Sequence, residues 1–392
     1  MADIYQKSME KHREWKGKLR IVAHAPINDR AELALAYTPG VAAACLAIQV
    51  DPLQLDELTW VNSTVAVISD GSAVLGLGNI GPKAGMPVME GKAALFARFA
   101  GLNAIPLCLD TQDTEEIIRI CKALAPSFGG INLEDISAPR CVSIERRLQA
   151  ELDIPVFHDD QHGTAIVVLA GLINALRLTG KQKEDVVITV SGTGAAGSSI
   201  LKLLRDYGFK TLYAFNKFGI LTHKKAIDQD FLQVELAQFV NPTQENYTLT
   251  QALVRSDVFI GVSAPNLVTY EMAAGMKKDA VLFAMANPEP EIDYDTAKAA
   301  GIRIVGTGRS DRPNQINNVL VFPGLFKGAL SAKAKQISEA MKIAAAEGLA
   351  SLINDEELSD DFIIPDVFDP RVADTVACAV MHEVQKKQNY GR

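Results

Sequence analysis

A glycine-rich turn between a strand and a helix constrains the fold of this chain more than any other stretch. The run Asp185–Ser191 predicts a buried strand. Gly192, Gly194 and Gly197 follow it with the G-x-G-x-x-G spacing, and Ala195–Tyr207 predicts a helix. In this setting the first glycine makes the turn, the second lets the backbone approach a pyrophosphate, and the third allows tight packing of helix on strand. The second half of the chain is therefore predicted to be a Rossmann-type dinucleotide-binding unit.

The end of the next predicted strand bears on the choice of nucleotide. Thr211–Phe215 ends at Asn216, where an NAD site normally has Asp or Glu for the ribose 2′-hydroxyl. Asn216 can still form hydrogen bonds and does not repel a 2′-phosphate, while Lys217, Lys224 and Lys225 could attract one. We therefore expect both NAD and NADP to work, with a modest preference for NADP.

The rest of the chain alternates predicted strands with predicted helices. In the first half we expect strands at residues 64–70, 104–109, 130–133 and 154–157, with helices at 114–125 and 139–151. Further strands are expected at 258–263, 280–287 and 303–306, followed by helices at 324–353 and 370–387. Such alternation implies parallel sheets with helices on their faces. We predict an α/β protein with an N-terminal parallel-sheet domain over residues 1–160. A Rossmann-type dinucleotide-binding domain with C-terminal helices is expected over residues 161–392.

Carboxylates follow the ends of several predicted strands, at Asp70, Asp110, Glu134–Asp135 and Asp159–Asp160. Parallel strands place such residues on one edge of the sheet. Glu134, Asp135 and Asp160 together offer the hard oxygen ligands that suit Mg²⁺ or Mn²⁺. Since neighbouring residues in an extended strand point to opposite faces, Glu134 and Asp135 can both ligate only if the chain turns there.

The stretch around Asp159 and Asp160 has two interpretations. Residues 155–157 predict a short buried strand, Gly163 predicts a turn, and Ala165–Leu176 predicts a helix of about three turns. An Asp-Asp pair ahead of a helix is often only its N-cap. Here Thr164 could cap the helix unaided, which leaves the pair for other work.

Lys92 is a candidate general base. A helix is expected to begin around Met89 and to run through Phe99, which puts Lys92 in its first turn among apolar neighbours. The polarity of a helix start and desolvation both disfavour a cation, so the pKa of Lys92 should be lowered, as a base requires. A lysine that reaches solvent would explain the same pattern.

Two glycine-containing turns in the first half remain ambiguous. Gly76–Gly81 also has the G-x-G-x-x-G spacing, but Pro82 follows and we expect no helix directly behind it, so we interpret it as a loop close to a ligand. Tyr37 precedes a Pro-Gly turn and the apolar helix Val41–Val50. A tyrosine at a turn is often only a surface filler.

Composition limits the possible functions. The chain has 392 residues, 48% of them hydrophobic and 22% charged, as in a soluble globular protein. A net charge of −8 argues against nucleic acid or an anionic membrane as partner. No apolar run is long enough for a membrane span, and Met1–Lys18, expected to be a polar helix, does not resemble a signal peptide. Five scattered cysteines suggest reduced thiols in the cytoplasm rather than a zinc site.

Motifs along nearly the whole chain resemble the short bacterial malic enzymes. They are Tyr37–Ala42, Ser69–Gly81, Met89–Lys92, Leu133–Asp135, Val156–Ala165, Ala286–Pro288 and Asn314–Val319. The resemblance implies oxidative decarboxylation of malate to pyruvate and CO₂ with NAD or NADP and a divalent metal. One departure concerns Gly71–Ala73, where the larger eukaryotic relatives carry an arginine for the substrate carboxylate and this chain has none.

By the same resemblance Lys92 would be the general base and Tyr37 the general acid, while Glu134, Asp135 and Asp160 would hold the metal. Asn287 and Asn318 would contact malate, and Asp159 is expected to orient Lys92. The expected cofactor-binding residues are Thr164, Gly192, Thr193, Gly194, Ala195, Ala196, Gly197, Asn216 and Asn287. We also expect a homodimer or a higher homo-oligomer.

Two other classes of function remain open. One is a metal-dependent oxaloacetate decarboxylase on the same scaffold, which makes no net use of nucleotide. The intact fingerprint at Gly192–Gly197 argues against it, whereas Asn216 leaves room for it. The other is a non-catalytic nucleotide-sensing module, which would not need Glu134, Asp135 and Asp160.

Overall fold

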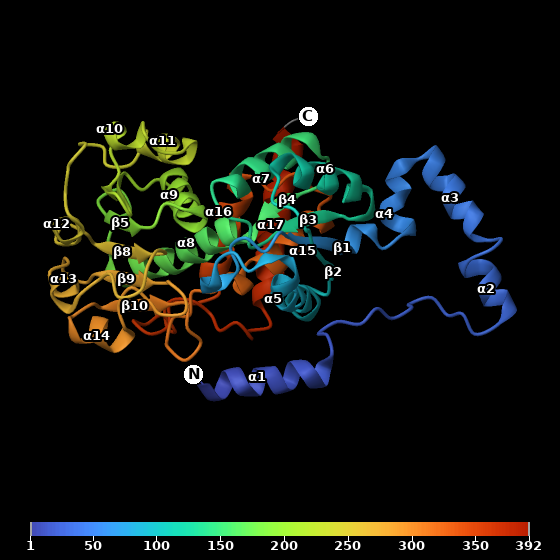
Figure 1. Ribbon diagram of the computed structural model, residues 1–392, viewed down its shortest axis with the longest axis horizontal. Helices are drawn as coiled ribbons and strands as arrows, with labels where there is room; N and C mark the ends of the chain where they lie inside the picture. The colour runs from blue at the N-terminus through green and yellow to red at the C-terminus, as the bar shows by residue number, and fades with distance from the viewer. Residues whose placement is uncertain (1, 391–392) are drawn as a thin grey trace.

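Two parallel sheets organise the chain, and the computed structural model describes residues 2–390 (Figure 1). The first sheet has the order β2-β1-β3-β4, and all its neighbouring strands run parallel. Its strands are β1 (Thr64–Ser69), β2 (Asn103–Cys108), β3 (Gly130–Leu133) and β4 (Val156–His158). Every residue of β1 and β3 is buried, as the near-continuous apolar runs of a sheet covered on both faces predict.

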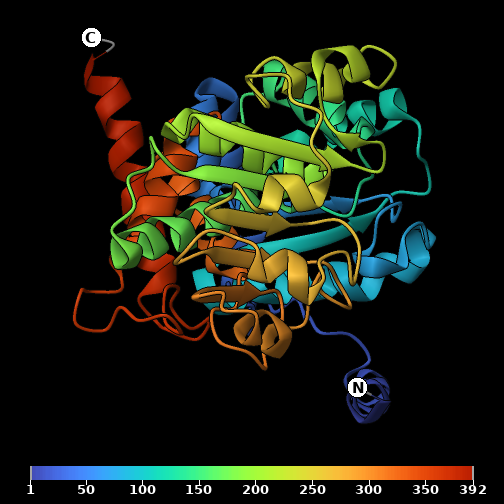
Figure 2. The ribbon, with the colours of Figure 1, turned by 90° about the vertical axis from the view of Figure 1, so that its left-hand side faces the viewer.

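The second sheet has the order β10-β9-β8-β5-β6-β7 (Figure 2). Its strands are β5 (Val187–Ser191), β6 (Thr211–Asn216), β7 (Gly219–Ile220), β8 (Val258–Gly261), β9 (Val281–Ala284) and β10 (Ile304–Thr307). All pairs are parallel except β6 with β7, which form a short antiparallel hairpin. The predicted α/β class with a parallel-sheet half followed by a Rossmann-type half is confirmed.

Helices precede, connect and follow the strands of these sheets. In the first half they are α1 (Ala2–Trp15), α2 (Arg30–Ala36), α3 (Val41–Val50), α4 (Leu55–Leu58), α5 (Gly81–Leu95), α6 (Thr114–Leu124) and α7 (Arg140–Glu151). Next come α8 (Asp159–Thr179), α9 (Ala195–Tyr207), α10 (His223–Ala226), α11 (Phe231–Ala237), α12 (Leu249–Leu253), α13 (Tyr270–Ala274) and α14 (Tyr294–Ala299). The last are α15 (Phe322–Ser331), α16 (Glu339–Ser351) and α17 (Val372–Tyr390).

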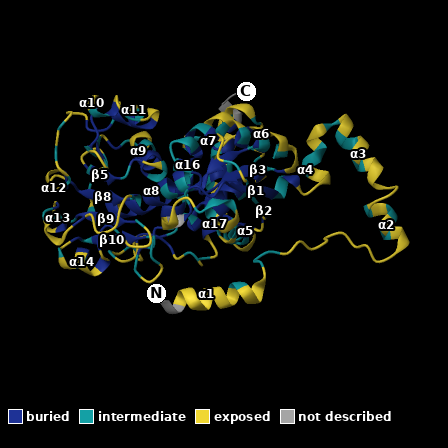
Figure 3. Cartoon of the chain, viewed as in Figure 1, coloured by how far each residue is buried: buried dark blue, intermediate teal, exposed yellow. Residues whose placement is uncertain are grey.

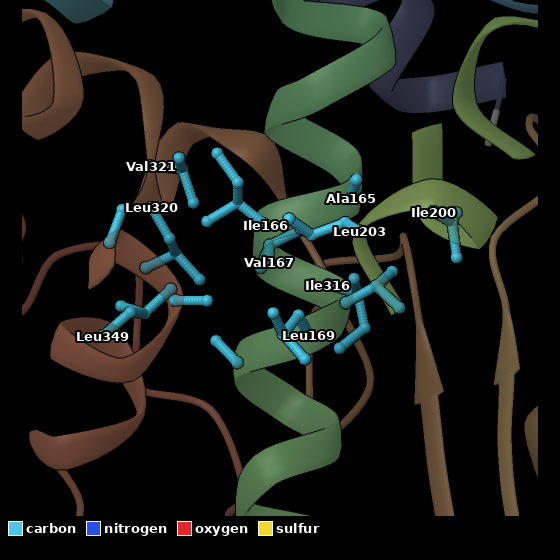
Figure 4. Close-up of a cluster of buried hydrophobic side chains, with 14 of the residues drawn as sticks. Ala165, Ile166, Val167, Leu169, Ile200, Leu203, Ile316, Leu320, Val321 and Leu349 are labelled. Atoms are coloured by element: carbon cyan, nitrogen blue, oxygen red, sulfur yellow. The ribbon is translucent and has the colours of Figure 1, made fainter. Parts of the chain in front are cut away.

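Helix α8 lies at the centre of the largest core. Its buried Ala165, Ile166, Val167 and Leu169 belong to one cluster with α9 and α16, and Figure 4 shows them beside Ile200, Leu203 and Leu349. The chain's later helices also cover the first sheet, because Phe322 and Phe326 of α15 pack edge-on against Phe96 and Phe157. Residues on both sides of the predicted boundary at 160 therefore build a common core.

Three predicted helix boundaries are wrong. Helix α5 begins at Gly81 rather than near Met89. Pro82 does not prevent this, because the N–H groups of a helix's first turn have no partner within the helix, so proline loses no hydrogen bond there. Lys92 therefore lies in the last turn of α5. The expected helix over residues 324–353 is two helices, since Lys333 has a left-handed backbone and Ser338 caps the start of α16.

The third error concerns α8, which begins at Asp159 without a glycine turn. Gly163 lies inside the helix, and neither the Asp-Asp pair nor Thr164 is its N-cap, which is His158. Glycine is present at position 163 because of a close contact with the side chain of Asp159, which the sequence does not reveal.

Among the described residues, two stretches are long and apolar enough to cross a membrane, residues 30–50 and 159–179. One or two such stretches are weak evidence, and α8 is mostly buried inside the protein. Residues 30–50 are split into α2 and α3, of which the longer has 10 residues. At about 1.5 Å per residue this helix covers about 15 Å, roughly half of the hydrocarbon core of a bilayer.

Candidate active site

Three carboxylates converge where β3 and β4 end. Glu134 follows β3, Asp135 comes next, and Asp160 lies in the first turn of α8. One oxygen of each lies within 4.8 Å of the others. Asp135 has a backbone φ of 54°, so the chain makes the turn that adjacent ligands require. Its amide donates a 2.7 Å hydrogen bond to Asp160 Oδ2, which ties the two loops together.

Lys92 reaches the same cluster from α5. Its ammonium lies 2.5 Å from Asp159 Oδ2 and 2.9 Å from Glu134 Oε1, and it stacks over the ring of Phe322 at 4.2 Å. Burial lowers the pKa of Lys92, but the negative charges of Asp159, Glu134 and Asp160 outweigh it and raise the pKa above the usual value. The expectation of a lowered pKa is therefore wrong for the protein without a bound cation.

The pKa values of the carboxylates shift toward the neutral form. Burial raises the pKa of Glu134 and of Asp159 to about 7 and that of Asp160 to about 6, although the charge of Lys92 opposes each shift. The ammonium of Lys92 therefore does not fully compensate the negative charges of these three buried carboxylates. A hard divalent cation is the group that such a donor set would hold.

Asp159 is fully buried between Lys92 and Asn318. Asn318 Nδ2 donates to Asp159 Oδ2, the same oxygen that accepts from Lys92. A Cβ on Gly163 would lie 1.9 Å from Asp159 Oδ1. Gly163 is therefore needed inside α8 because the Asp159 carboxylate occupies the space of a side chain.

The close contact between Gly163 and Asp159 can be tested with two substitutions in α8. Gly163→Ala should lower both stability and activity, because the new methyl group must displace Asp159 and with it Lys92. Gly171→Ala in the same helix is the matched control, since its Cβ would meet neighbours at no less than 3.4 Å. The control should be neutral or gain up to about 1 kcal/mol from helix propensity. Urea unfolding and the malate oxidation expected from the sequence measure this in both variants, and equal behaviour of the two would contradict the role given to Gly163.

A cleft of about 1290 Å³ opens over this cluster. It is lined by Lys92, Glu134, Asp135, Asp160, Thr164, Ala195, Ala196, Asn287 and Asn318, together with Ala73 and Gly76 of the glycine-rich loop. A neighbouring cavity of about 470 Å³ is lined by Gly192, Thr193, Gly194 and Asn216. Ala138, Ser263 and Ala264 line both, so the two spaces adjoin. The structure thus brings the carboxylates, the lysine and the fingerprint into one continuous site.

Gly197 has a packing role. A Cβ there would lie 1.8 Å from the carbonyl oxygen of Gly192, so only glycine lets α9 approach the strand end so closely. The packing role predicted for the third glycine is confirmed.

Asn216 is held at the end of β6 by its neighbours. Its Nδ2 donates to Gln229 Oε1 at 2.8 Å, and its Oδ1 accepts from the amide of Phe218 at 2.9 Å. Lys217 lines the cavity beside it. Lys225 instead donates to Asn246.

Tyr37 is a predicted site residue that the structure keeps away from both cavities. It lies between α2 and α3, which stand off from the body of the molecule, and 67% of it is exposed (Figures 1 and 3). No tyrosine is among the described residues that line the cleft.

Several residues that support the site were not predicted from the sequence. Asn132 is buried in β3 and donates a 2.8 Å hydrogen bond to Glu134 Oε2. Phe322 covers Lys92, and Arg140 pairs with the buried Asp70 at 2.6 Å while it donates to Ser72. A polar residue inside an otherwise apolar strand was the available signal for Asn132. The other contacts join distant parts of the chain and have no local signature.

Comparison with known families matches both halves of the chain. The model for "Malic enzyme, N-terminal domain" matches residues 16–149, and that for "Malic enzyme, NAD binding domain" matches residues 161–385. The chain is 52% identical to an NAD-dependent malic enzyme of Geobacillus stearothermophilus over 93% of this chain and 76% of the relative. It is 44% identical to an NADP-dependent malic enzyme of Rhizobium meliloti over 96% of this chain and 51% of that larger protein.

Solved structures agree with the sequence matches. An NAD-dependent malic enzyme from Thermotoga maritima superimposes with a TM-score of 0.92 at 48% identity, covering 95% of this chain and 98% of its own. A malic enzyme from Pyrococcus horikoshii superimposes with a TM-score of 0.92 at 44% identity, covering 97% of this chain and 91% of its own.

Proposed function

The chain belongs to the malic enzyme family, and from this premise we propose how its cleft oxidises and decarboxylates malate to pyruvate and CO₂ with NAD or NADP. The observation that carries the proposal is the buried contact of Lys92 with Asp159 and Glu134 at the floor of the cleft. The dinucleotide fingerprint opens into the same cleft through Ala195 and Ala196. A base, a carboxylate cluster and a nucleotide site are then within reach of one small substrate.

Glu134, Asp135 and Asp160 would hold a divalent cation, Mg²⁺ or Mn²⁺, because their oxygens converge, and because burial and neighbouring carboxylates raise the pKa values of Glu134 and Asp160, a strain that a cation would relieve. A bound cation would lower the pKa of Lys92, polarise the C2 oxygen of malate and favour loss of the C4 carboxylate. Asn132 would keep Glu134 oriented through its hydrogen bond to Oε2.

Lys92 is proposed to take the proton of the malate C2 hydroxyl while the nicotinamide accepts the hydride from C2. Asp159 is proposed to be a positioning residue, since it holds the Lys92 ammonium and is itself held by Asn318. Asn287 and Asn318 line the same cleft as the carboxylates, and their amides can donate hydrogen bonds to the substrate without adding charge.

The dinucleotide is proposed to lie across both cavities. The backbone at Gly192–Ala196 would bind the pyrophosphate at the start of α9, where unpaired N–H groups point outward. The nicotinamide would then lie in the cleft near Thr164 and Asn287, and the adenosine ribose in the cavity near Asn216. The five cysteines are all free, in keeping with a proposed cytoplasmic location.

Cofactor choice gives a direct test of the role of position 216. We expect wild type to use both nucleotides with a modest preference for NADP. Asn216→Asp should raise the NAD preference, because its carboxylate would repel a 2′-phosphate a few ångströms away. The ratio of kcat/KM for the two nucleotides measures this.

Asn354→Asp is the matched control, since Asn354 is exposed, lies outside both cavities and the change adds the same charge. The control should leave the ratio unchanged. A wild type strongly specific for NAD, or an Asn216→Asp ratio that does not move, would show that the 2′ group is recognised elsewhere.

A further inference from the structure

A buried cluster of ionisable side chains lies outside the cleft, next to the segment that carries Asp160. Glu145, His162 and Lys342 come from three different helices, α7, α8 and α16. Glu145 and Lys342 are each only 2% exposed. Charged residues are seldom buried so completely unless they are paired. None of the three lines either cavity, so contact with a ligand does not account for their burial.

Glu145 accepts hydrogen bonds from both sides of the Asp159–Asp160 pair. Its Oε1 accepts from the backbone amide of His158 at 2.8 Å. Its Oε2 accepts from Gln161 Nε2 at 3.1 Å and from His162 Nε2 at 2.9 Å. All three donors belong to one short segment where β4 meets α8. Glu145 therefore holds this segment immediately before and immediately after the two aspartates.

Lys342 determines which nitrogen of His162 carries the ring hydrogen. Its Nζ lies 3.0 Å from His162 Nδ1, closer than the 3.4 Å to Nε2, and donates to Glu339 Oε1 at 2.7 Å. An ammonium only donates, so the nearer ring nitrogen must accept from it. Nε2 then carries the hydrogen that is donated to Glu145. The bonds from Lys342 through His162 to Glu145 thus run in one direction.

The surroundings keep Glu145 ionised. Burial alone would raise the pKa of this carboxyl group, but His162 and Lys342 hold it at about 2, below its usual value. A carboxylate accepts at both oxygens and donates at neither, which suits a position with three donors. In a buried setting these charge-assisted bonds are strong and directional.

We propose that Glu145 is a positioning residue for the metal site, and that Lys342 supports it through His162. The inference rests on the proposed function, because it concerns the cation that Glu134, Asp135 and Asp160 would hold. A divalent cation such as Mg²⁺ requires closely defined oxygen positions. Groups that orient the ligands without touching the cation typically affect its affinity about 10–100-fold.

A purely structural role of the cluster is the alternative. Loss of Glu145 would then lower the stability of the protein but leave the cation affinity of the folded molecules unchanged. The contacts favour positioning, because all three donors to Glu145 flank the aspartates instead of being spread over the helices it packs against. Cation affinity therefore distinguishes the two roles.

Glu145→Gln tests the role of the carboxylate with little change in volume. The new oxygen can still accept from the His158 amide, but the new NH₂ group faces the N–H groups of Gln161 and His162. We expect calorimetric titration to show Mn²⁺ affinity about 10–100-fold below that of wild type. Affinity for NADH, measured by fluorescence without Mn²⁺, should stay at the wild-type value.

Glu151→Gln is the matched control. It removes the same charge from the same helix, α7, but Glu151 is exposed and pairs with Lys122 and Arg147. The control should bind both Mn²⁺ and NADH like wild type.

The direction of the His162 bonds allows a second test. In Glu145→Gln the ring cannot move its hydrogen to Nδ1, because the Lys342 ammonium faces that nitrogen. Lys342→Met removes the ammonium, so His162 can carry its hydrogen on Nδ1 and accept from the new amide at Nε2. Members of one hydrogen-bond network are not additive. The double variant should therefore bind Mn²⁺ about tenfold more tightly than Glu145→Gln alone.

Each outcome of these titrations decides the proposal. Wild-type Mn²⁺ affinity in Glu145→Gln would overturn it, and so would parallel losses of Mn²⁺ and NADH affinity with a lower melting temperature. A double variant that binds Mn²⁺ no better than Glu145→Gln would overturn the support by Lys342. If Glu145→Gln does not fold, Lys342→Met alone should lower Mn²⁺ affinity about tenfold, and an unchanged affinity would overturn the proposal. A wild type that binds no Mn²⁺ would instead refute the metal site of the proposed function.

Discussion

Asp160→Ala is expected to abolish malate oxidation at ordinary Mn²⁺ concentrations. The change removes one of three converging carboxylates and the acceptor of the Asp135 amide, so both the charge and the geometry of the cation site are lost. Weakening a hydrogen bond to a metal ligand typically costs up to about 100-fold in affinity, and loss of a ligand should cost at least as much. Calorimetric titration with Mn²⁺ and activity at increasing Mn²⁺ measure the effect.

Asp153→Ala serves as the control for Asp160→Ala. Asp153 is also a carboxylate of the first domain, but its side chain is 86% exposed and pairs only with Lys335 in the described contacts. The control should bind Mn²⁺ and oxidise malate like wild type. Full activity of Asp160→Ala at ordinary Mn²⁺ would remove Asp160 from the metal site.

Lys92→Ala is expected to lose malate oxidation by roughly 100-fold or more, the usual size of a general-base contribution. Tyr37→Phe should behave differently, because its group acts only after hydride transfer. That variant should still oxidise malate weakly and release oxaloacetate. Assaying nucleotide reduction and pyruvate formation separately in both variants distinguishes the two steps. Equal and small losses in both would contradict the assigned roles.

Folding must be checked in the Lys92 series. Removing the ammonium leaves Asp159 and Glu134 buried without their cation, which can cost about 3–5 kcal/mol. Lys92→Arg keeps the charge but changes the position and basicity of the donor. We expect it to melt close to wild type and still to lose most of the activity. This result would separate the chemical role of Lys92 from its structural one.

The sequence allowed the sheets and their connections to be predicted because their signals are local. The fingerprint at Gly192–Gly197 and the apolar run at Thr64–Ser69 each carry their own strand and turn information. Helix starts were less predictable. Pro82 was interpreted as a break, yet the first turn of a helix tolerates proline. Gly163 was interpreted as a turn because its contact with Asp159 depends on the packed helix.

The electrostatics of the site could not be predicted from neighbours in the sequence. Lys92 was expected to have a lowered pKa from its place in a helix, but its closest charge, Asp159, is 67 residues away along the chain. That charge and Glu134 reverse the direction of the shift. The exposed position of Tyr37 could not be predicted either, because it depends on how α2 and α3 stand off from the rest of the protein.

The stoichiometry of the reaction tests the central account most directly. Purified protein is supplied with malate, Mn²⁺ and either nucleotide, and reduced nicotinamide and pyruvate are measured in the same sample. We predict one reduced nucleotide for each pyruvate, with both products lost when the cation is chelated. Release of pyruvate from oxaloacetate without any malate-dependent nucleotide reduction would contradict the account and identify a decarboxylase instead.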